Sequence, residues 1–217
     1  SGLRKLVLER GVARDCVGFI DAIPIDRAGA RFFIDFANRA VPTDIATRYV
    51  IQNGLLGRMV YGEARLDDNI SVPTKMWGDR TKDFAAGSST AHFLLSHVVD
   101  LLRWYFTPAE VTDVYAISQQ TVLGYTPDLY DAFLTFDSGL KVRVKAEWIK
   151  HMDELVEFYL GFSGSEGTLI YNKGPGFGVE RSWRANLSTQ LDADDAASGP
   201  AYVDGLFAHP RGRGGAA

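Results

Sequence analysis

The sequence predicts an α+β fold in which a large, mainly antiparallel open sheet has helices on one face. Strand signals follow one another after Pro108 and are separated by short turns such as Asp-Ser-Gly at 137–139, the pattern of an antiparallel meander. Within residues 140–149, apolar residues alternate with charged ones, so one face of the sheet is covered and the other meets water or a partner. A strand–helix–strand pattern precedes the sheet and favours parallel pairing.

The elements before the sheet follow from local signals. They are a strand at 5–9, a helix at 15–29, a strand at 32–37 and a helix at 43–54. Pro24 kinks or shortens the first helix, because proline lacks the backbone N–H that a helix interior uses. Thr43 is the expected N-cap of the second helix, and Asn53 with Gly54 ends it.

The sheet itself is expected to begin with a strand at 58–65, followed by a long polar loop at 66–87. Ser88 or Ser89 then caps a helix. The remaining strands are expected at 111–121, 129–136, 140–149, 155–162 and 168–172. The helices are the natural cover of the apolar face, which gives a two-layer domain. From residue 186 onward Asp, Ala, Ser and Gly dominate, and we expect a flexible tail at 186–217.

Composition excludes several classes of function. The chain has 217 residues, a formal net charge of -4 and a pI of about 5.6, which argues against nucleic-acid binding. Cys16 is the only cysteine, so no intrachain disulfide forms, and we expect a cytoplasmic setting. No apolar run is long enough to span a bilayer. The chain opens on a strand-like segment without an initiator methionine, so a fragment of a longer protein is expected.

The helix expected after Ser88 carries two histidines and an aspartate among apolar residues. His92 and His97 are five residues apart, about 140° around an α-helix, so they cannot ligate one metal from a single face. His97 and Asp100 share a stripe with Phe93. Two interpretations of His97 remain open: a hydrogen-bonded core residue, or a general acid–base group whose intrinsic pKa suits proton transfer near neutrality. We expect no metal site.

Three stretches, taken in order, resemble the glucose–fructose oxidoreductase / inositol dehydrogenase (Gfo/Idh/MocA) family. Residues 5–13, KLVLERGVA, are similar to its last Rossmann strands with their Glu-Lys-Pro motif. Residues 32–64 are similar to its strand, Asn-Arg turn, helix and first strand of the large sheet, and residues 96–116 to its His-x-x-Asp helix and the strand that follows. The resemblance covers roughly residues 3–171. It implies the end of a Rossmann domain at 1–39 and an α+β substrate and oligomerisation domain at 40–185.

The resemblance also implies roles for individual residues. His97 is the expected catalytic acid–base group, and Glu9 and Arg10 are expected at the cofactor. The expected substrate-binding residues are Arg10, Asn38, Arg39, His92 and Asp100. Three positions depart from the family pattern: Arg10 replaces the usual catalytic lysine, Gly11 replaces the proline after it, and Phe93 replaces the usual aspartate. The arginine guanidinium stays protonated and does not readily transfer a proton, and the phenylalanine side chain has no acid–base group.

The sequence therefore predicts the substrate-binding and oligomerisation part of an NAD(P)-dependent oxidoreductase acting on a sugar-like or polyol substrate. NAD or NADP would be used by the full-length parent, and none is expected to bind this chain alone, which would be inactive by itself. The expected partner is a second copy of the chain on the open sheet face, with no nucleic acid and no membrane. Two alternatives stay open: a non-catalytic ligand-binding or scaffold member of the fold, and an NAD-dependent glycoside hydrolase.

Overall fold

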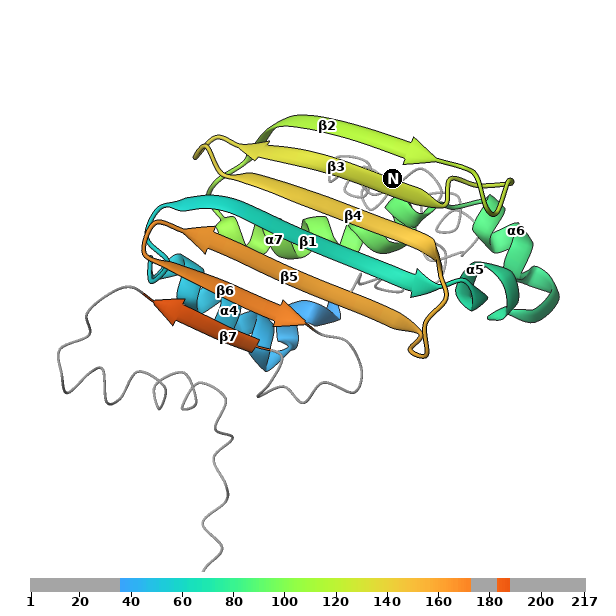
Figure 1. Cartoon of the computed structure of the whole chain (residues 1–217), viewed down its shortest axis with the longest axis horizontal. Helices are drawn as coiled ribbons and strands as arrows, with labels where there is room; N and C mark the ends of the chain where they lie inside the picture. The colour runs from blue at the N-terminus through green and yellow to red at the C-terminus, as the bar shows by residue number, and fades with distance from the viewer. Residues whose placement is uncertain (1–35, 173–182, 188–217) are drawn as a thin grey trace, which may run out of the picture.

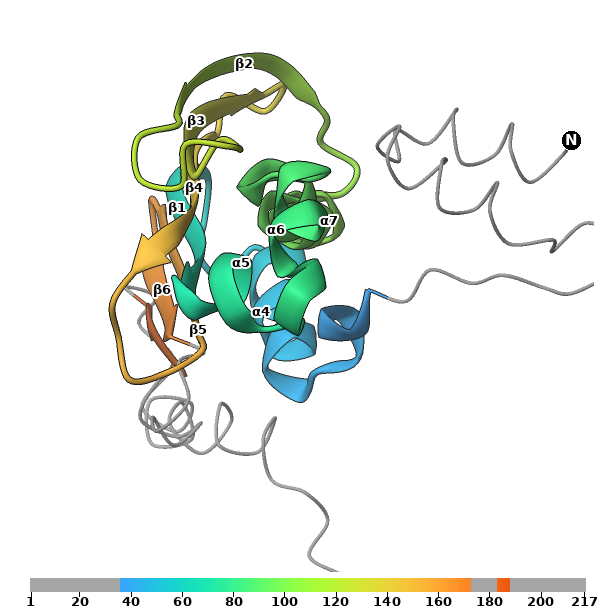
Figure 2. The same ribbon diagram turned by 90° about the vertical axis from the view of Figure 1, so that its right-hand side faces the viewer.

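A computed structural model describes residues 36–172 and 183–187 of the chain. Within these residues one sheet carries helices on a single face (Figures 1 and 2). The helical elements are η1 (Ala37–Ala40), α4 (Pro42–Gln52), α5 (Ser71–Lys75), η2 (Gly78–Arg80), α6 (Thr81–Ala86), the π-helical η3 (Ala91–Leu95) and α7 (Ser96–Phe106). The strands are β1 (Met59–Asn69), β2 (Val111–Gln119), β3 (Leu129–Phe136), β4 (Lys141–Lys150), β5 (Val156–Gly164), β6 (Gly167–Asn172) and β7 (Trp183–Leu187).

The strands lie in the order β2-β3-β4-β1-β5-β6-β7. Every neighbouring pair is antiparallel except β1 and β4, which are parallel. The predicted α+β class with a large, mainly antiparallel open sheet is confirmed. The predicted uninterrupted meander is wrong, because β1 is inserted between β4 and β5 and pairs along both of its edges.

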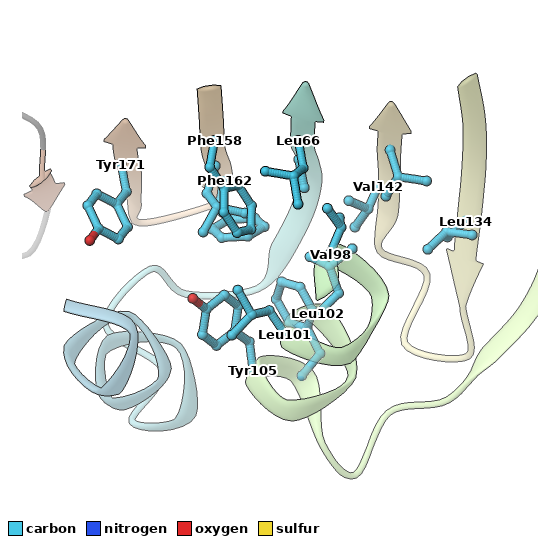
Figure 3. Packing of buried hydrophobic residues seen from close by; sticks show 14 of the residues in the cluster. Leu66, Val98, Leu101, Leu102, Tyr105, Leu134, Val142, Phe158, Phe162 and Tyr171 are labelled. Carbon is cyan, nitrogen blue, oxygen red and sulfur yellow. The ribbon is translucent and has the colours of Figure 1, made fainter. Parts of the chain in front are cut away.

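The core lies between the sheet and the helices (Figure 3). The predicted alternation of β4 is confirmed, since its core-facing residues Val142, Val144, Ala146 and Trp148 are all buried. From the helix side, α7 contributes the buried Val98, Leu101, Leu102 and Tyr105. On β1 the core position Gly62 has no side chain because an added Cβ would lie 2.9 Å from the ring of Phe162. Small residues in the central strand therefore let large ones from β5 pack above it.

Three local predictions are wrong. Residues 66–87 do not form a long loop, because β1 continues to Asn69 and α5, η2 and α6 follow. Val41 rather than Thr43 is the N-cap of α4, with Pro42 in the first helical turn, where its missing N–H costs nothing. Ala37, expected at the end of a strand, begins η1. Asn53 and Gly54 do end α4, and Gly54 has the left-handed φ of 68° that glycine adopts without strain.

Several expectations fall outside the described residues. They are the strands and helix of residues 1–35, and with them Glu9 and Arg10, the Rossmann remnant, and most of the tail at 186–217. The last strand, β7, includes the first two residues of that expected tail. No helix among the described residues is long and apolar enough to cross a membrane.

Candidate functional site

The helix that carries His97 begins with a π-helical turn. At η3 the N–H of Ser96 bonds to the carbonyl of Ala91, five residues back, instead of four. Residues four apart therefore no longer align across this turn, and the predicted stripe that joins Phe93 to His97 and Asp100 is not formed. Ser89 caps the helix, as predicted: Thr90 is its first helical residue, the carbonyl of Ser89 accepts a hydrogen bond from the N–H of Phe93 at 2.9 Å, and its hydroxyl accepts one from the N–H of His92 at 3.3 Å. Single π turns occur frequently at functional sites.

Phe93 lies in an aromatic cluster and not beside His97. Its ring centroid is 6.0 Å from that of Trp77, 5.5 Å from Phe84 and 5.8 Å from the buried Trp148. Edge-to-face packing of this kind stabilises a core by about 0.5–1.5 kcal/mol per pair beyond area burial. The residue at the family's aspartate position is thus part of the hydrophobic packing between α6, η3 and β4.

His97 packs against the segment that leads into α4. Its ring stands edge-on to Phe36, with centroids 6.1 Å apart. Its Nδ1 is buried and has no hydrogen-bond partner among residues 36–172 and 183–187. Burial lowers the pKa of His97, and the negative charge of Asp100 opposes this only in part. The imidazole is therefore neutral near pH 7 and able to accept a proton.

Asp100 and Arg39 form a two-pronged ion pair beside His97. The Nε of Arg39 donates to one carboxylate oxygen of Asp100 at 2.8 Å, and Nη2 donates to the other. The side chain of Asp100 is 10% exposed and that of Arg39 is 46% exposed. The same guanidinium lies 5.9 Å from the centre of the Phe36 ring. We call Phe36, Arg39, His97 and Asp100 the His97 cluster; it joins η1 to α7.

The other predicted site residues stand apart from this cluster or outside the described chain. The Nδ1 of His92 lies 2.9 Å from the hydroxyl of Ser89, so this exposed side chain turns back toward the start of the helix. Asn38 lies in η1, next to Arg39, and its carbonyl accepts a hydrogen bond from Val41 at 3.1 Å. The structure thus brings Arg39, His97 and Asp100 together and leaves Glu9 and Arg10 undescribed.

Sequence reasoning missed a pair of buried aspartates at the end of β1. Asp67 is 0% exposed on the open face and lies 3.2 Å from the Nζ of Lys145 and 2.8 Å from that of Lys150. Asp68 is 2% exposed on the helix side, where Trp148 Nε1 donates to it at 3.2 Å. Burial raises the pKa of Asp68 to about 7. Two adjacent aspartates within a strand were a signal for this pair in the sequence. Consecutive strand residues face opposite sides of the sheet, so one carboxylate lies on each face.

Several solved structures share this fold, and the three described next are oxidoreductases. Levoglucosan dehydrogenase in complex with NADH and L-sorbose superposes with a TM-score of 0.58 at 19% identity, over 72% of this chain and 44% of that chain. An NAD binding oxidoreductase from Klebsiella pneumoniae gives 0.57 at 21% identity, over 79% and 46%. The WlbA dehydrogenase from Bordetella pertussis in complex with NADH and UDP-GlcNAcA gives 0.57 at 22% identity, over 84% and 54%. At these identities the likeness shows the fold, and this chain spans about half the length of each.

A protein-family model also matches the sequence of this chain. Residues 45–170 match the GFO/IDH/MocA C-terminal domain, which is more than half of the chain. The chain therefore belongs to the GFO/IDH/MocA family, and the resemblance predicted from its motifs is confirmed. No curated protein sequence matches it.

Proposed function

We propose that this chain is the substrate-binding part of an NAD(P)-dependent oxidoreductase that acts on a sugar-like or polyol substrate. Family membership and the oxidoreductase fold support the reaction class. The substrate class is supported by the solved relatives, two of which are bound in their structures to L-sorbose and to UDP-GlcNAcA. The proposal rests above all on one observation: the buried Nδ1 of His97, which has no hydrogen-bond partner in the described part of the chain, lies beside the Asp100–Arg39 pair.

The His97 cluster suits the removal of a proton from a carbinol. Oxidation of a hydroxyl releases one hydride and one proton, and a nicotinamide cofactor, when bound, would supply the hydride acceptor. The neutral imidazole of His97 accepts the proton, and the imidazolium that forms is stabilised by the charge of Asp100. An unpaired buried polar group costs about 1–3 kcal/mol, so a hydrogen bond from a ligand to this ring recovers free energy on binding. The exposed part of the Arg39 guanidinium is a donor for substrate oxygens.

The roles of Glu9 and Arg10 at the cofactor stay predictions, because both residues lie outside the described ranges. Among the described residues, the loops between strands carry no Gly-rich turn leading into a helix that would hold a dinucleotide phosphate. The choice between NAD and NADP and the binding of either one therefore belong to residues beyond this part of the chain.

A His97→Gln substitution tests the proposal. Glutamine keeps the approximate volume and the hydrogen-bonding capacity but removes the titrating ring. In a full-length protein that includes the dinucleotide domain, turnover with its sugar or polyol is expected to fall about 100-fold or more. The fold should be intact, and because burial lowers the pKa of His97, wild type should lose stability relative to the variant as pH falls below 6.5. Unchanged turnover would mean that His97 is a structural core residue and not the acid–base group.

One observation favours a second candidate, a non-catalytic ligand-binding or scaffold member of the family. Phe93 stands at the family's aspartate position and is packed among Trp77, Phe84 and Trp148, so it offers no proton donor there. This candidate predicts binding of a sugar-like ligand without net nicotinamide reduction. Isothermal titration together with absorbance at the reduced-nicotinamide band separates the two, since only the oxidoreductase gives both signals.

We also propose that the open face of the sheet meets a second copy of the chain. Several of its charges are already paired within one copy, among them Arg143 with Asp131 at 2.6 Å and Arg65 with Glu157 at 2.8 Å. When charges are paired within one copy, a second copy can cover the face without burying an unpaired ion. The resulting interface is polar and hydrated. Sedimentation across a wide concentration range tests this proposal, and a chain that stays monomeric throughout contradicts it.

A further inference from the structure

Strand β2 is an edge strand that has the residue pattern of an interior strand. It pairs with β3 along one side and has no other strand beside it within the described residues (Figure 1). Its large apolar residues are exposed on both faces: Val114 is 63% exposed, Tyr115 is 70% and Ile117 is 48%. Edge strands are usually protected by lysine, proline or inward-pointing charges. The strand VTDVYAISQ has no lysine and no proline, and Asp113 is its single charge.

The sequence of β2 is complementary to itself when it is read in the antiparallel direction about its central residue. Tyr115 is the middle of the nine residues, so a two-fold axis there places Tyr115 opposite its own copy. Val114 then faces Ala116 on each side of the axis. These are pairs that stabilise adjacent strands: apolar with apolar, and aromatic with aromatic.

Charge and backbone geometry agree with this register. Asp113 faces Ile117 of the other copy, so the two aspartates are not opposed across the junction. The pairing of β2 with β3 is regular from Asp113 to Gln119, so the five central pairs rest on regular strand backbone. On the open face Tyr115 lies beside Phe133 of β3, which is 43% exposed. The junction would therefore join two Tyr115–Phe133 pairs into one row of four aromatic rings.

We propose that β2 pairs antiparallel with β2 of a second copy about Tyr115, so that two sheets become one continuous sheet. The contact uses the edge of the sheet and is separate from the open face discussed above. It does not depend on the proposed oxidoreductase activity, because no residue of the His97 cluster takes part. Backbone hydrogen bonds provide the affinity, and the facing side chains fix the register.

Cysteine crosslinking tests the register directly. In a Cys16→Ser background of the 217-residue chain, Tyr115→Cys places two Cβ atoms roughly 4.5–5.5 Å apart, within reach of a disulfide after a small adjustment. Asp113→Cys is the matched control: its two copies would be four residues apart along the strands, roughly 13 Å, and too far to bridge. Mixing Asp113→Cys with Ile117→Cys restores a facing pair.

The expected result is a covalent dimer with Tyr115→Cys and with the Asp113→Cys and Ile117→Cys mixture, and none with either of those two variants alone. Tyr115→Lys should remove the β2–β2 contact and so halve the mass of the largest species in sedimentation, while leaving the circular dichroism spectrum and thermal unfolding unchanged, since the side chain is exposed and two lysines would face each other. The proposal is overturned if Tyr115→Cys stays monomeric under oxidising conditions, or if Asp113→Cys alone crosslinks as efficiently.

Discussion

An Asp68→Asn substitution is expected to stabilise the protein above neutral pH. The Asp68 carboxylate is buried on the helix side of β1, where it accepts a hydrogen bond from the indole N–H of Trp148 at 3.2 Å. Burial raises its pKa from 3.8 to about 7, the Trp148 hydrogen bond opposes this, and the charge of Asp67 adds to it. Asparagine keeps an oxygen for the indole and removes the charge.

The magnitude follows from the difference between the folded and unfolded pKa values. A carboxyl whose folded pKa is raised stabilises the fold in its protonated form, and this advantage is lost as pH rises from 3.8 to 7. Above pH 7 the ionised Asp68 costs up to about 4 kcal/mol relative to a neutral residue. At pH 5 the same difference in pKa makes Asp68 cost about 1.5 kcal/mol of folding free energy relative to a neutral residue. The variant's gain in stability should therefore grow by about 2–3 kcal/mol between pH 5 and pH 8.5.

Urea unfolding at pH 5 and pH 8.5, followed by tryptophan fluorescence and circular dichroism, measures this difference. Asp67→Asn is the matched control one residue away on the opposite face. Burial raises the pKa of Asp67 as well, but Lys150 and Lys145 oppose the shift. Because the net pKa of Asp67 is still raised, Asp67→Asn should also gain stability as pH rises, but by less than Asp68→Asn, since two lysine ammonium groups lose a partner.

The two neighbouring substitutions are thus expected to differ in the size of the stability gained between pH 5 and pH 8.5, and the larger gain belongs to Asp68→Asn. The reasoning is refuted if Asp68→Asn destabilises the protein at pH 8.5, which would mean that the ionised carboxylate is satisfied by groups other than Trp148. A gain that is equal at both pH values would also refute it, because the effect would then not come from titration of this carboxyl.

Two further predictions follow from the His97 cluster and from a close backbone contact. Because the charge of Asp100 raises the pKa of His97, Asp100→Asn should lower that pKa further in an NMR titration, whereas Asp131→Asn on the open sheet face should leave it unchanged. Gly164→Ala should destabilise the chain by about 3 kcal/mol in thermal or urea unfolding, since its Cβ would lie 2.0 Å from the carbonyl oxygen of Leu56; a wild-type unfolding midpoint would contradict the packing described for β5.

The candidate site could be predicted only in part, because a helical stripe assumes 3.6 residues per turn. That spacing correctly places His97 and Asp100 on one side of α7, since they lie beyond the π turn. It wrongly adds Phe93, which lies within the turn and contacts Trp148 instead. Nothing local marks a π turn, because it depends on how η3 packs against β4. Likewise, Arg39 precedes its partner Asp100 by 61 residues, and Phe36 is equally far from His97. Only the folded chain brings these two residues to α7.

The sequence by itself determined the family, the α+β class and the faces of the strands. Those properties depend on short-range patterns: alternation along β4, turn residues between strands, and motifs in a fixed order. The position of β1 between β4 and β5 was decided only by the tertiary structure, because strand order depends on contacts between segments about 80 to 100 residues apart, such as Ala64 with Val144 and with Leu160. The ionisation of Asp68 was decided there too, since its pKa depends on the low-dielectric layer that closes over it when the helices pack on the sheet.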